Sequence, residues 1–428
     1  MTLAGPFSFV LAQDPPIDAE LIKKAQAIHE RVIILDSHVD IAVANFTGER
    51  NYTERLDNQF NLPKMFDGGV SAVFLVVYVG QTTEARDPDA FKRSGYERAY
   101  GAAIEKFEAI HRLTKELAPD KIELALTSDD VRRIKAKGKK AALIGVENGY
   151  PIGEEIGRVK EFFDRGGRYL SLSHNGHSQL SDSNTGERDG WKWNGLSPLG
   201  KQVIAEMNKV GLMIDVSHPS KASMMQTLEL SKAPIIASHS AVRALCDVSR
   251  NMDDEQLLAL KKSGGVMQVV AYSGFIKMPK PDSSERMAAL ATLRREFNLP
   301  EPPPRGQRGN MRLALAQLTA ERREEFENKL AVIDKEYPGD PPASVKDLID
   351  HIDYAVKLIG LDHVGITSDF DGGGGITGWN DTSETFNVTL ELVRRGYTEE
   401  QIGKLWGGNL LRVMDEVQRI ASELRKTE

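Results

Sequence analysis

Residues Val32 to Asp40, with the sequence VIILDSHVD, join a short apolar run to two side chains that bind metals. The run VIIL has the β-branched character of a buried strand, and His38 and Asp40 follow it within a few positions. Side chains at positions i and i+2 of a strand point to the same face, so His38 and Asp40 share a face. In a parallel barrel the carboxyl ends of the strands form one face, where catalytic groups gather. The segment therefore predicts a barrel strand with a metal-binding pair at its end.

The same arrangement recurs along the chain, because further apolar runs are followed at once by a coordinating or proton-handling side chain. The runs AALIGV, YLSLS, LMIDVS, PIIAS and HVGITS lead to Glu147, His174, His218, His239 and Asp369. Amphipathic segments with glycine-rich junctions separate most of these runs, which is the alternation of strand and helix in a parallel sheet. We predict an α/β fold, a (β/α)8 TIM barrel with its metal site at the C-terminal face of the strands.

Three further elements are predicted between Asp40 and Glu147. A continuous apolar run over Ala72 to Val79 predicts a second strand. A long polar helix is expected over about Asp87 to Leu117, and the sequence IELALT predicts a strand over Ile122 to Thr127.

The last helix before Asp369 has the clearest sequence signals. Ser344 and Asp347 form a capping-box-like start, an apolar stripe follows at helical spacing, and Gly360 ends the helix. Earlier helices are expected to begin at Pro198 and Asp253.

The alternation of strand and helix is interrupted over about residues 276–342. Proline-rich segments bracket a charged helical stretch from Leu313 to Lys335. We interpret this part as a helical insertion in a late βα loop, with a solvated spacer as the plain alternative for most of its charges. The domain prediction is a leader over residues 1–14 and a single metal-dependent hydrolase barrel domain over residues 15–428.

The composition supports a large buried core and excludes several kinds of partner. Of 428 residues, 40% are hydrophobic and 27% are charged, close to ordinary globular usage. A net charge of −7 argues against a nucleic-acid backbone as partner, and no apolar run has the ~18 residues of a stable membrane span. The single cysteine, Cys246, excludes an internal disulfide and is expected to be a small buried hydrophobe.

The first residues, MTLAGPFSFVLAQDPP, contain an apolar stretch that ends in small residues typical of a signal-peptidase site. They lack the positively charged start of a signal peptide. Two interpretations follow: a signal peptide whose start codon was assigned too far downstream, or an apolar leader on a cytoplasmic protein. We expect export, periplasmic or secreted, with the cytoplasm as the alternative.

Taken singly, each candidate ligand has an ordinary explanation. An H-x-D pair occurs by chance in many proteins, a glutamate after a strand is often solvated on a loop, and a lone histidine is more often structural. The repetition at matching positions favours a metal site. Five ligands are too many for one catalytic zinc, which usually keeps three protein ligands, but suffice for two ions sharing a carboxylate. The mix of imidazole and carboxylate suits Zn²⁺, with Mn²⁺ or Co²⁺ as substitutes.

Seven ordered segments resemble one known family, the renal (membrane) dipeptidases, which are zinc metallopeptidases, in its bacterial type. They are DSHVD, GVENG, YLSLSHNG, NGLSPLGKQVIAEMN, MIDVSH, ASHSAVRALCDVSRN and HVGITSDFDG, and the match runs from about Val32 to Asn409. The resemblance implies a (β/α)8 barrel with two Zn²⁺ per chain that hydrolyses dipeptides, often tolerating a D-amino acid at the C-terminal position. Two departures are the insertion, which puts substrate size in doubt, and the single cysteine, which rules out the disulfides of animal members.

Carried over residue by residue, the resemblance implies two zinc sites with a shared ligand. His38 and Asp40 match the ligands of one zinc, His218 and His239 match those of the other, and Glu147 matches the bridging carboxylate.

The resemblance also implies roles for four residues beside the metals. His174 matches a histidine that polarises the scissile carbonyl, Arg250 matches the arginine that receives the substrate carboxylate, and Asp369 matches the acid/base. Tyr272 matches a substrate-contacting tyrosine in a less similar stretch. The ordinary alternatives are a surface salt bridge for Arg250 and an aspartate that merely holds a ligand for Asp369.

Three other aspartates receive supporting roles. Asp36 and Asp215 lie within predicted strands just before ligands, so we expect them to orient histidines. Asp371 precedes a run of four glycines and is expected to be a turn residue.

The expected reaction is dipeptide hydrolysis by a metal-bridging hydroxide, with Asp369 as the proton shuttle. One alternative keeps the metals and changes the substrate: an amide or lactam hydrolase, or a tailoring enzyme on a peptide-like metabolite. Another is a barrel that binds metal or peptide without turnover, which the intact ligand set argues against. A nucleic-acid deaminase is excluded because the H-x-E…P-C-x-x-C signature is absent. The expected partner is a dipeptide or peptide-like small molecule, and a homodimer is the expected assembly.

Overall fold

The structure, a computed structural model, describes residues 18–301, 314, 315 and 317–427. It forms two compact units: one comprises the described residues up to 276 and those from 343 onward, and the other lies within residues 277–342. The predicted leader over residues 1–14 lies outside the described residues.

The first unit is built on eight parallel strands in a nearly closed barrel. In spatial order these are β1 (Leu35–Asp40), β2 (Ala72–Tyr78), β4 (Lys140–Glu147), β5 (Gly167–Ser171), β6 (Met213–Asp215), β7 (Ile236–Ser240), β8 (Val266–Val270) and β9 (Val364–Thr367). The first and last strands meet through a parallel bridge between Val39 and Phe370, where the Asp40 N–H donates to the Phe370 carbonyl at 2.9 Å. The predicted (β/α)8 barrel is confirmed.

Burial on both faces explains why the strands are such continuous apolar runs. Every residue of β2 before Tyr78 is buried, and so is every residue of β4 after Lys140. These two strands pair in a single register from Ala72 opposite Ala141 to Tyr78 opposite Glu147. The register brings Tyr78 and Glu147 to the same rim of the barrel.

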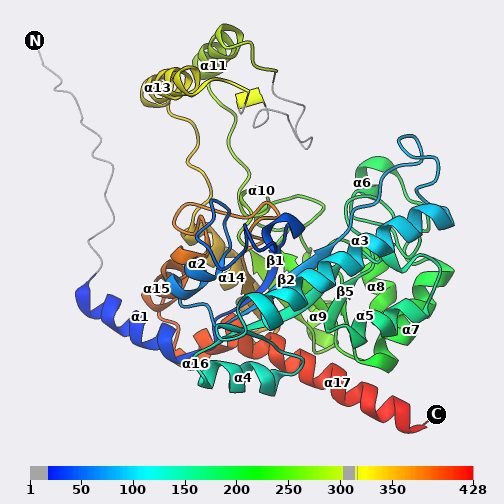
Figure 1. Cartoon of the computed structure of the whole chain (residues 1–428). Helices are drawn as coiled ribbons and strands as arrows, with labels where there is room; N and C mark the ends of the chain where they lie inside the picture. Colours follow the sequence, from blue (N-terminus) through cyan, green and yellow to red (C-terminus); the bar gives the residue numbers. More distant parts are fainter. Residues whose placement is uncertain (1–17, 302–313, 316, 428) are drawn as a thin grey trace, which may run out of the picture. The chain divides into compact units, whose positions relative to one another are not determined.

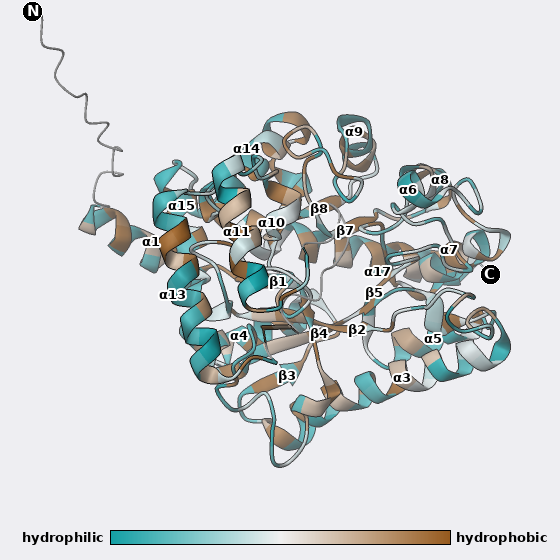
Figure 2. Cartoon of the chain, turned by 90° about the horizontal axis from the view of Figure 1, so that it is seen from above, coloured by the Kyte–Doolittle hydropathy of each residue, from teal (hydrophilic) through white to brown (hydrophobic). Residues whose placement is uncertain are grey.

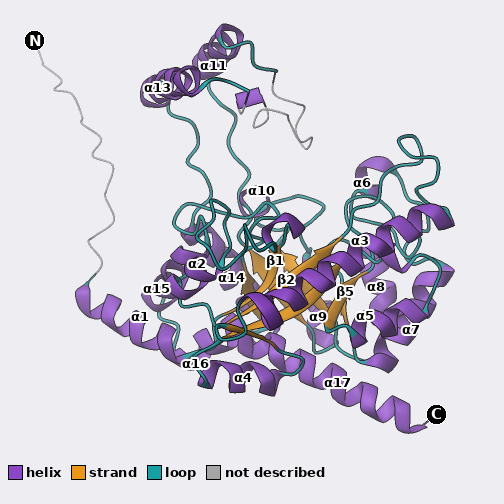
Figure 3. Cartoon of the chain, in the orientation of Figure 1, coloured by secondary structure: helices purple, strands orange, loops and turns teal. Residues whose placement is uncertain are grey.

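Helices surround the strands, as Figures 1 and 3 show for the barrel unit. Seen from above in Figure 2, strands β2, β4 and β5 are brown, whereas helices such as α3 carry teal as well as brown. The helices are α1 (Ala19–Arg31), α2 (Leu62–Asp67), α3 (Arg93–Arg112), α4 (Ser128–Ala136), α5 (Gly157–Asp164), α6 (Gly186–Asp189), α7 (Pro198–Val210), α8 (Lys221–Leu230), α9 (Asp254–Lys262), α10 (Ser273–Ile276), α14 (Val345–Ile359), α15 (Phe386–Arg394), α16 (Glu399–Gly403) and α17 (Asn409–Thr427). Among the described residues, no helix is both long enough and apolar enough to span a bilayer.

The helix boundaries follow the sequence signals closely where caps are present. Helix α14 begins with the predicted capping box of Ser344 and Asp347 and ends at Gly360, whose φ is 88°. Helix α7 begins at Pro198, and α9 follows an N-cap at Asp253 that also forms a capping box.

Two early predictions need correction. The strand expected over Ile122 to Thr127 is shorter, β3 (Ile122–Leu124), and it pairs with β4 outside the barrel path. The long helix expected from Asp87 begins only at Arg93, because the Asp87 carboxylate accepts the Asp89 N–H at 2.9 Å and holds a turn there. It continues to Leu117 as one turn of π-helix.

The described residues of the second unit include the helices α11 (Ser284–Glu296) and α13 (Ala320–Glu336). Leu293, Phe297, Leu299 and Phe326 form its small core. In the stretch expected to be helical over Leu313 to Lys335, Ala314 and Leu315 are helical and α13 begins at Ala320, after an N-cap at Thr319. Residues 302–313 lie outside the described part. Helix α11 was not predicted, because it buries only Leu293 and so shows little apolar periodicity.

Candidate metal centre

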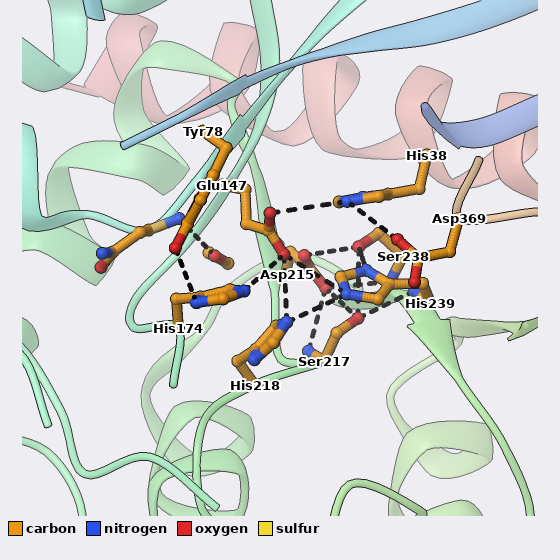
Figure 4. Close-up of polar contacts among 12 residues, drawn as sticks. His38, Tyr78, Glu147, His174, Asp215, Ser217, His218, Ser238, His239 and Asp369 are labelled. Carbon is orange, nitrogen blue, oxygen red and sulfur yellow. Dashed lines mark hydrogen bonds and ion pairs between the residues drawn. The ribbon is translucent and has the colours of Figure 1, made fainter. Parts of the chain in front are cut away.

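The polar side chains expected at the strand ends meet at one rim of the barrel. β1 carries His38 and Asp40, β4 ends with Glu147, and β7 carries His239. The remaining members, His174, His218 and Asp369, follow β5, β6 and β9 by two or three residues. Figure 4 shows His38 and His174 reaching Glu147 from opposite sides. Parallel strands place their carboxyl ends together, so residues from the whole length of the chain converge.

The Glu147 carboxylate lies at the centre of this group. Its Oε1 is 3.0 Å from His218 Nε2, 3.3 Å from His239 Nε2 and 3.8 Å from His174 Nε2. Its Oε2 is 3.6 Å from His38 Nε2. The side chain is only 3% exposed, so the carboxylate cannot rely on water to solvate it.

Among the described residues, three overlapping groups of side chains have the spacing of a metal site. Their ligand atoms lie within 4.8 Å of one another, and the groups are His38–Asp40–Glu147, Glu147–His174–His218 and His38–His239–Asp369. The buried Nε2 of His38 makes no hydrogen bond to any described residue, although it points at three carboxylates. A buried nitrogen that lacks a hydrogen bond and lies among imidazoles and carboxylates fits a divalent cation of the Zn²⁺ type.

The protonation equilibria point to the same need for a cation. Burial, then the nearby charge of Glu147, raises the pKa of Asp40 to about 6. Burial and the carboxylates of Asp40 and Glu147 also raise the pKa of Asp369 well above its usual value, against the opposing effect of His38. Burial alone would lower the pKa of His38, but Glu147 and the two aspartates raise it to about 10. Clustered carboxylates without enough countercharge produce such shifts, and bound cations remove them.

His218 and His239 are held in their neutral forms. Burial and the charge of Arg250 lower the pKa of His218 well below its usual value. Burial, His38 and Arg250 do the same to the pKa of His239. Burial would raise the pKa of Glu147, but the neighbouring histidines, His38 first, lower it well below the ordinary range. Neutral imidazoles beside an ionised carboxylate are the protonation states that metal ligands require.

Asp215 supports His239 through a serine rather than directly. Its Oδ2 accepts the Ser238 hydroxyl at 2.6 Å, and Ser238 Oγ lies 2.9 Å from His239 Nδ1. Asp36 contacts no histidine ring. It accepts the His38 N–H at 3.3 Å and the Ser368 N–H at 3.0 Å, so it ties the two closing strands together.

Arg250 is buried beside the histidines and is not part of a surface salt bridge. Its guanidinium donates to the carbonyl of Ser217 and, at 3.2 Å, to that of His239, and one nitrogen lies 3.1 Å from His218 Nε2. Burial lowers the pKa of Arg250 to about 10, which leaves it charged at neutral pH. A buried cation at this rim can receive an anionic group of a ligand.

The glycine run after β9 brings the backbone close to the acidic side chains. A Cβ at Gly372 would lie 2.2 Å from Asp40 Oδ2 and 2.4 Å from Asp369 Oδ1, so only glycine fits there. Asp369 itself has a φ of 59°, an unusual conformation for a non-glycine residue at a functional site. The partly buried Tyr272 packs on the same run, 2.8 Å from the position of a Cβ at Gly373.

Asp371 is a turn residue, as expected, but it also makes long-range contacts. Its φ is 61°, and its carboxylate accepts the Gln59 N–H and the Asn58 side-chain amide, each at 2.8 Å. The loop after β1 is therefore tied to the loop after β9. Cys246 is buried, as predicted.

Two tyrosines in the site were missed by the sequence analysis. Tyr78 ends β2, and its hydroxyl lies 3.2 Å from His174 Nδ1. The fully buried Tyr169 in β5 places its hydroxyl 3.0 Å from His38 Nδ1. Tyr78 had a usable signal, since it ends an apolar run as the predicted ligands do. Tyr169 had none, because it opens its run and looks like a core aromatic.

Comparisons with known proteins give a consistent result. The family model described as Membrane dipeptidase (Peptidase family M19) matches residues 22–428. Dipeptidase aclJ from Aspergillus oryzae is 28% identical over 408 residues, covering 93% of this chain and 81% of that protein. Dipeptidase 3 from Rattus norvegicus is 28% identical over 412 residues, covering 94% of this chain and 69% of that protein.

The fold is also similar to that of solved structures. The probable dipeptidase PvdM from Pseudomonas aeruginosa is 33% identical with a TM-score of 0.74, and the match covers 94% of this chain and 99% of that one. The family match spans nearly all of the barrel and includes every residue of the site described above. The chain therefore belongs to the membrane dipeptidase family, peptidase family M19, and is a metallo-dipeptidase.

Proposed function

We propose that this chain is a binuclear zinc dipeptidase. One observation carries the proposal: the buried carboxylate of Glu147 faces His38 with one oxygen and His218 and His239 with the other. A carboxylate with both oxygens engaged in this way is suited to bridging two ions. His38 and Asp40 would hold one ion, and His218 and His239 the other.

Two bound divalent ions would supply Lewis acidity and make a shared water acidic enough to attack near neutral pH. The protein's own residues carry the proton steps. Asp369, with Oδ1 3.9 Å from His38 Nε2, takes the proton of the attacking water and passes it to the leaving amine. His174, whose Nδ1 is 3.2 Å from the Tyr78 hydroxyl, presents its Nε2 to the carbonyl oxygen on which negative charge develops.

Substrate length is set in this proposal by Arg250, which receives the free carboxylate of the second residue, with Tyr272 lining the same side. A substrate with a neutral C-terminus should bind poorly, because the buried guanidinium of Arg250 would lose its water without gaining a negatively charged partner. A metallopeptidase from Rhodobacter sphaeroides, 21% identical with a TM-score of 0.64 over 90% of this chain and 99% of that one, is liganded with a phosphinate mimic of L-Ala-D-Ala. Tolerance of a D-residue is therefore part of the proposal.

The test compares free and C-terminally amidated dipeptides, with L- and D-residues in the second position, after the metal content has been measured. We expect about two zinc ions per chain and a preference for free carboxylates of roughly 10- to 100-fold, the scale of a charged hydrogen bond. Arg250→Ala should abolish that preference.

Arg243→Ala is the matched control, because Arg243 pairs at the surface with Glu187 at 2.7 Å. It should keep the preference. Equal rates on free and amidated substrates in the unmodified enzyme would favour the broader amide or lactam hydrolase instead.

Export and homodimer formation stay predictions. The leader on which export depends lies outside the described residues.

A further inference from the structure

A buried phenol lies behind His38, on the side away from the carboxylates. Tyr169 belongs to β5, which is not a neighbour of β1 in the barrel, so its side chain crosses the barrel interior to reach His38. We infer that Tyr169 is a positioning residue that holds His38 in the one tautomer able to bind a cation. The inference rests on the proposed function, in which His38 is a metal ligand.

One arrangement of hydrogens makes the contacts of the phenol with both Ser37 and His38 hydrogen bonds. Tyr169 Oη lies 3.2 Å from the Ser37 carbonyl oxygen and 3.0 Å from His38 Nδ1. A carbonyl oxygen can only accept, so the single phenol hydrogen is directed at Ser37. The Ser238 hydroxyl also contacts Tyr169, but its own hydrogen is donated to Asp215 at 2.6 Å. With the phenol hydrogen on the Ser37 carbonyl, the contact with His38 is a hydrogen bond only when His38 Nδ1–H donates it.

This arrangement determines the state of the other ring nitrogen. When a cation takes the place of the second ring proton, His38 keeps one hydrogen, and an Nδ1–H committed to Tyr169 leaves the lone pair on Nε2 to bind that cation. That nitrogen is the buried atom that faces Glu147 Oε2 at 3.6 Å and makes no hydrogen bond to any described residue. The phenol thus presents the metal-binding nitrogen to the site, the part that a carboxylate or carbonyl usually plays behind a metal-binding histidine.

The barrel is shaped to admit this side chain. A Cβ on Gly145 of β4 would lie 2.0 Å from Tyr169 Cζ and 2.3 Å from its Oη, so any larger residue would displace the ring. The ring packs against Phe74 with centroids 5.1 Å apart and is nearly parallel to His38, at 18°. The same packing is available to phenylalanine. The hydroxyl is therefore needed for the hydrogen bonds and not to fill the core.

The experiment compares the wild type with Tyr169→Phe and a control, Tyr100→Phe. The control also removes a phenol hydrogen bond, because the Tyr100 hydroxyl donates to Glu161 at 2.7 Å. Tyr100 lies on helix α3, away from the site. Each protein is stripped with a chelator and titrated with Zn²⁺ in competition with a chromophoric chelator. Tyr169→Phe should weaken one of two zinc positions by about 10- to 100-fold, the usual effect of losing a partner behind a ligand, and leave the other unchanged. Tyr100→Phe should leave both unchanged.

Two further readouts separate positioning from general damage. Metal-free Tyr169→Phe should unfold at nearly the same temperature as the control, and the ¹⁵N shifts of zinc-loaded wild type should place the His38 proton on Nδ1. Gly145→Ala should weaken the same zinc position by displacing the ring. Two unchanged affinities in Tyr169→Phe, or a His38 proton on Nε2, would overturn this inference alone. A wild type that binds no Zn²⁺ would remove the proposed function and this inference together.

Discussion

The barrel and the insertion over residues 277–342 both contain many charged side chains, but they use them in opposite ways. At the barrel rim, Glu147 is 3% exposed and lies within 4 Å of four histidines. In the insertion, Glu325 is 41% exposed and pairs with Arg322 at 2.6 Å and Lys329 at 3.0 Å. Water solvates the second glutamate and not the first. The difference shows that burial, more than the number of charges, determines what a charge can do in this molecule.

The two regions also differ in their cores. The barrel's cores draw on every strand and most surrounding helices, whereas the small core of the insertion, among its described residues, has four buried side chains. A substitution in the barrel should therefore affect the whole unit, and the equivalent change in the insertion should stay local.

The largest expected effect is that of Glu147→Gln, which keeps the shape and removes the charge that the two proposed zinc positions share. It should empty both positions, and more completely than His38→Gln, because only Glu147 faces both. Activity should fall by at least about 10³-fold, since the ions supply several kcal/mol of transition-state stabilisation. Glu325→Gln makes the same chemical change in the insertion and should leave zinc content and kcat unchanged. An active, zinc-loaded Glu147→Gln would erase the contrast between the two regions.

Asp369→Asn should come next, with kcat reduced by roughly 10²-fold or more, the scale of a lost general base. Zinc content and KM should stay close to those of the unmodified enzyme. The control is Asp334→Asn, since Asp334 is 51% exposed and pairs with Arg286 at 2.8 Å in the insertion. Loss of zinc in Asp369→Asn would make Asp369 a ligand, and full activity would leave it without a role in the reaction.

A pair of leucine truncations tests the difference between the cores. Leu348→Ala in α14 removes a fully buried side chain and should lower the free energy of unfolding of the barrel by about 2–5 kcal/mol. Leu293→Ala in α11 makes the same change in the insertion. It should reduce amide protection in α11 and α13 only. If Leu293→Ala also lowered the unfolding midpoint of the barrel, the two units would be one cooperative structure.

The smallest expected effect concerns pH. Burial lowers the pKa of His351 below its ordinary value of 6.5, and the neutral ring accepts the Val242 N–H at 3.1 Å and donates to the Ile276 carbonyl at 2.9 Å. The unfolded chain then takes up a proton before the folded protein does. The stability that His351 contributes is complete above pH 6.5 and is lost as the pH falls below it, by up to about 1.4 kcal/mol per pH unit.

Urea unfolding between about pH 5 and pH 7 measures this loss, and His351→Gln should show a shallower dependence. The insertion contains no histidine, so the unfolding of α11 and α13 should lack this contribution. Identical pH slopes for the wild type and His351→Gln would show that His351 contributes nothing to the acid sensitivity of the barrel.

Much of the fold could be predicted because its signals are local. A buried parallel strand must be apolar on both faces, and a helix must cap its ends, so β2, α7, α9 and α14 were visible in the sequence. The insertion was harder, because α11 buries a single residue and helix formation there depends on packing against α13. The short off-path strand β3 was indistinguishable from a barrel strand, since pairing partners leave no local trace.

The site also contains residues that the sequence pattern indicated and contacts that it did not. Four of the site residues could be proposed from the sequence, because each directly follows or lies in an apolar run: His38, Glu147, His218 and His239. A parallel barrel brings all such positions to one rim. Their roles as ligands stay predictions to be tested by metal analysis. The contact between Asp371 and Gln59 had no counterpart in the sequence pattern.

The sequence by itself determined which residues stand at the strand ends and which of them share a face. Both follow from the two-residue period of a strand and from the chain direction, which are local properties. The tertiary structure alone decided that the Tyr169 phenol meets His38 and that Gly145 leaves room for it. The first contact joins β1 and β5, which are not neighbours, so it depends on how the barrel closes. The second depends on the register in which β4 pairs with β5, which sets Gly145 opposite Tyr169. Closure is a property of all eight strands together, and no single segment of the sequence encodes it.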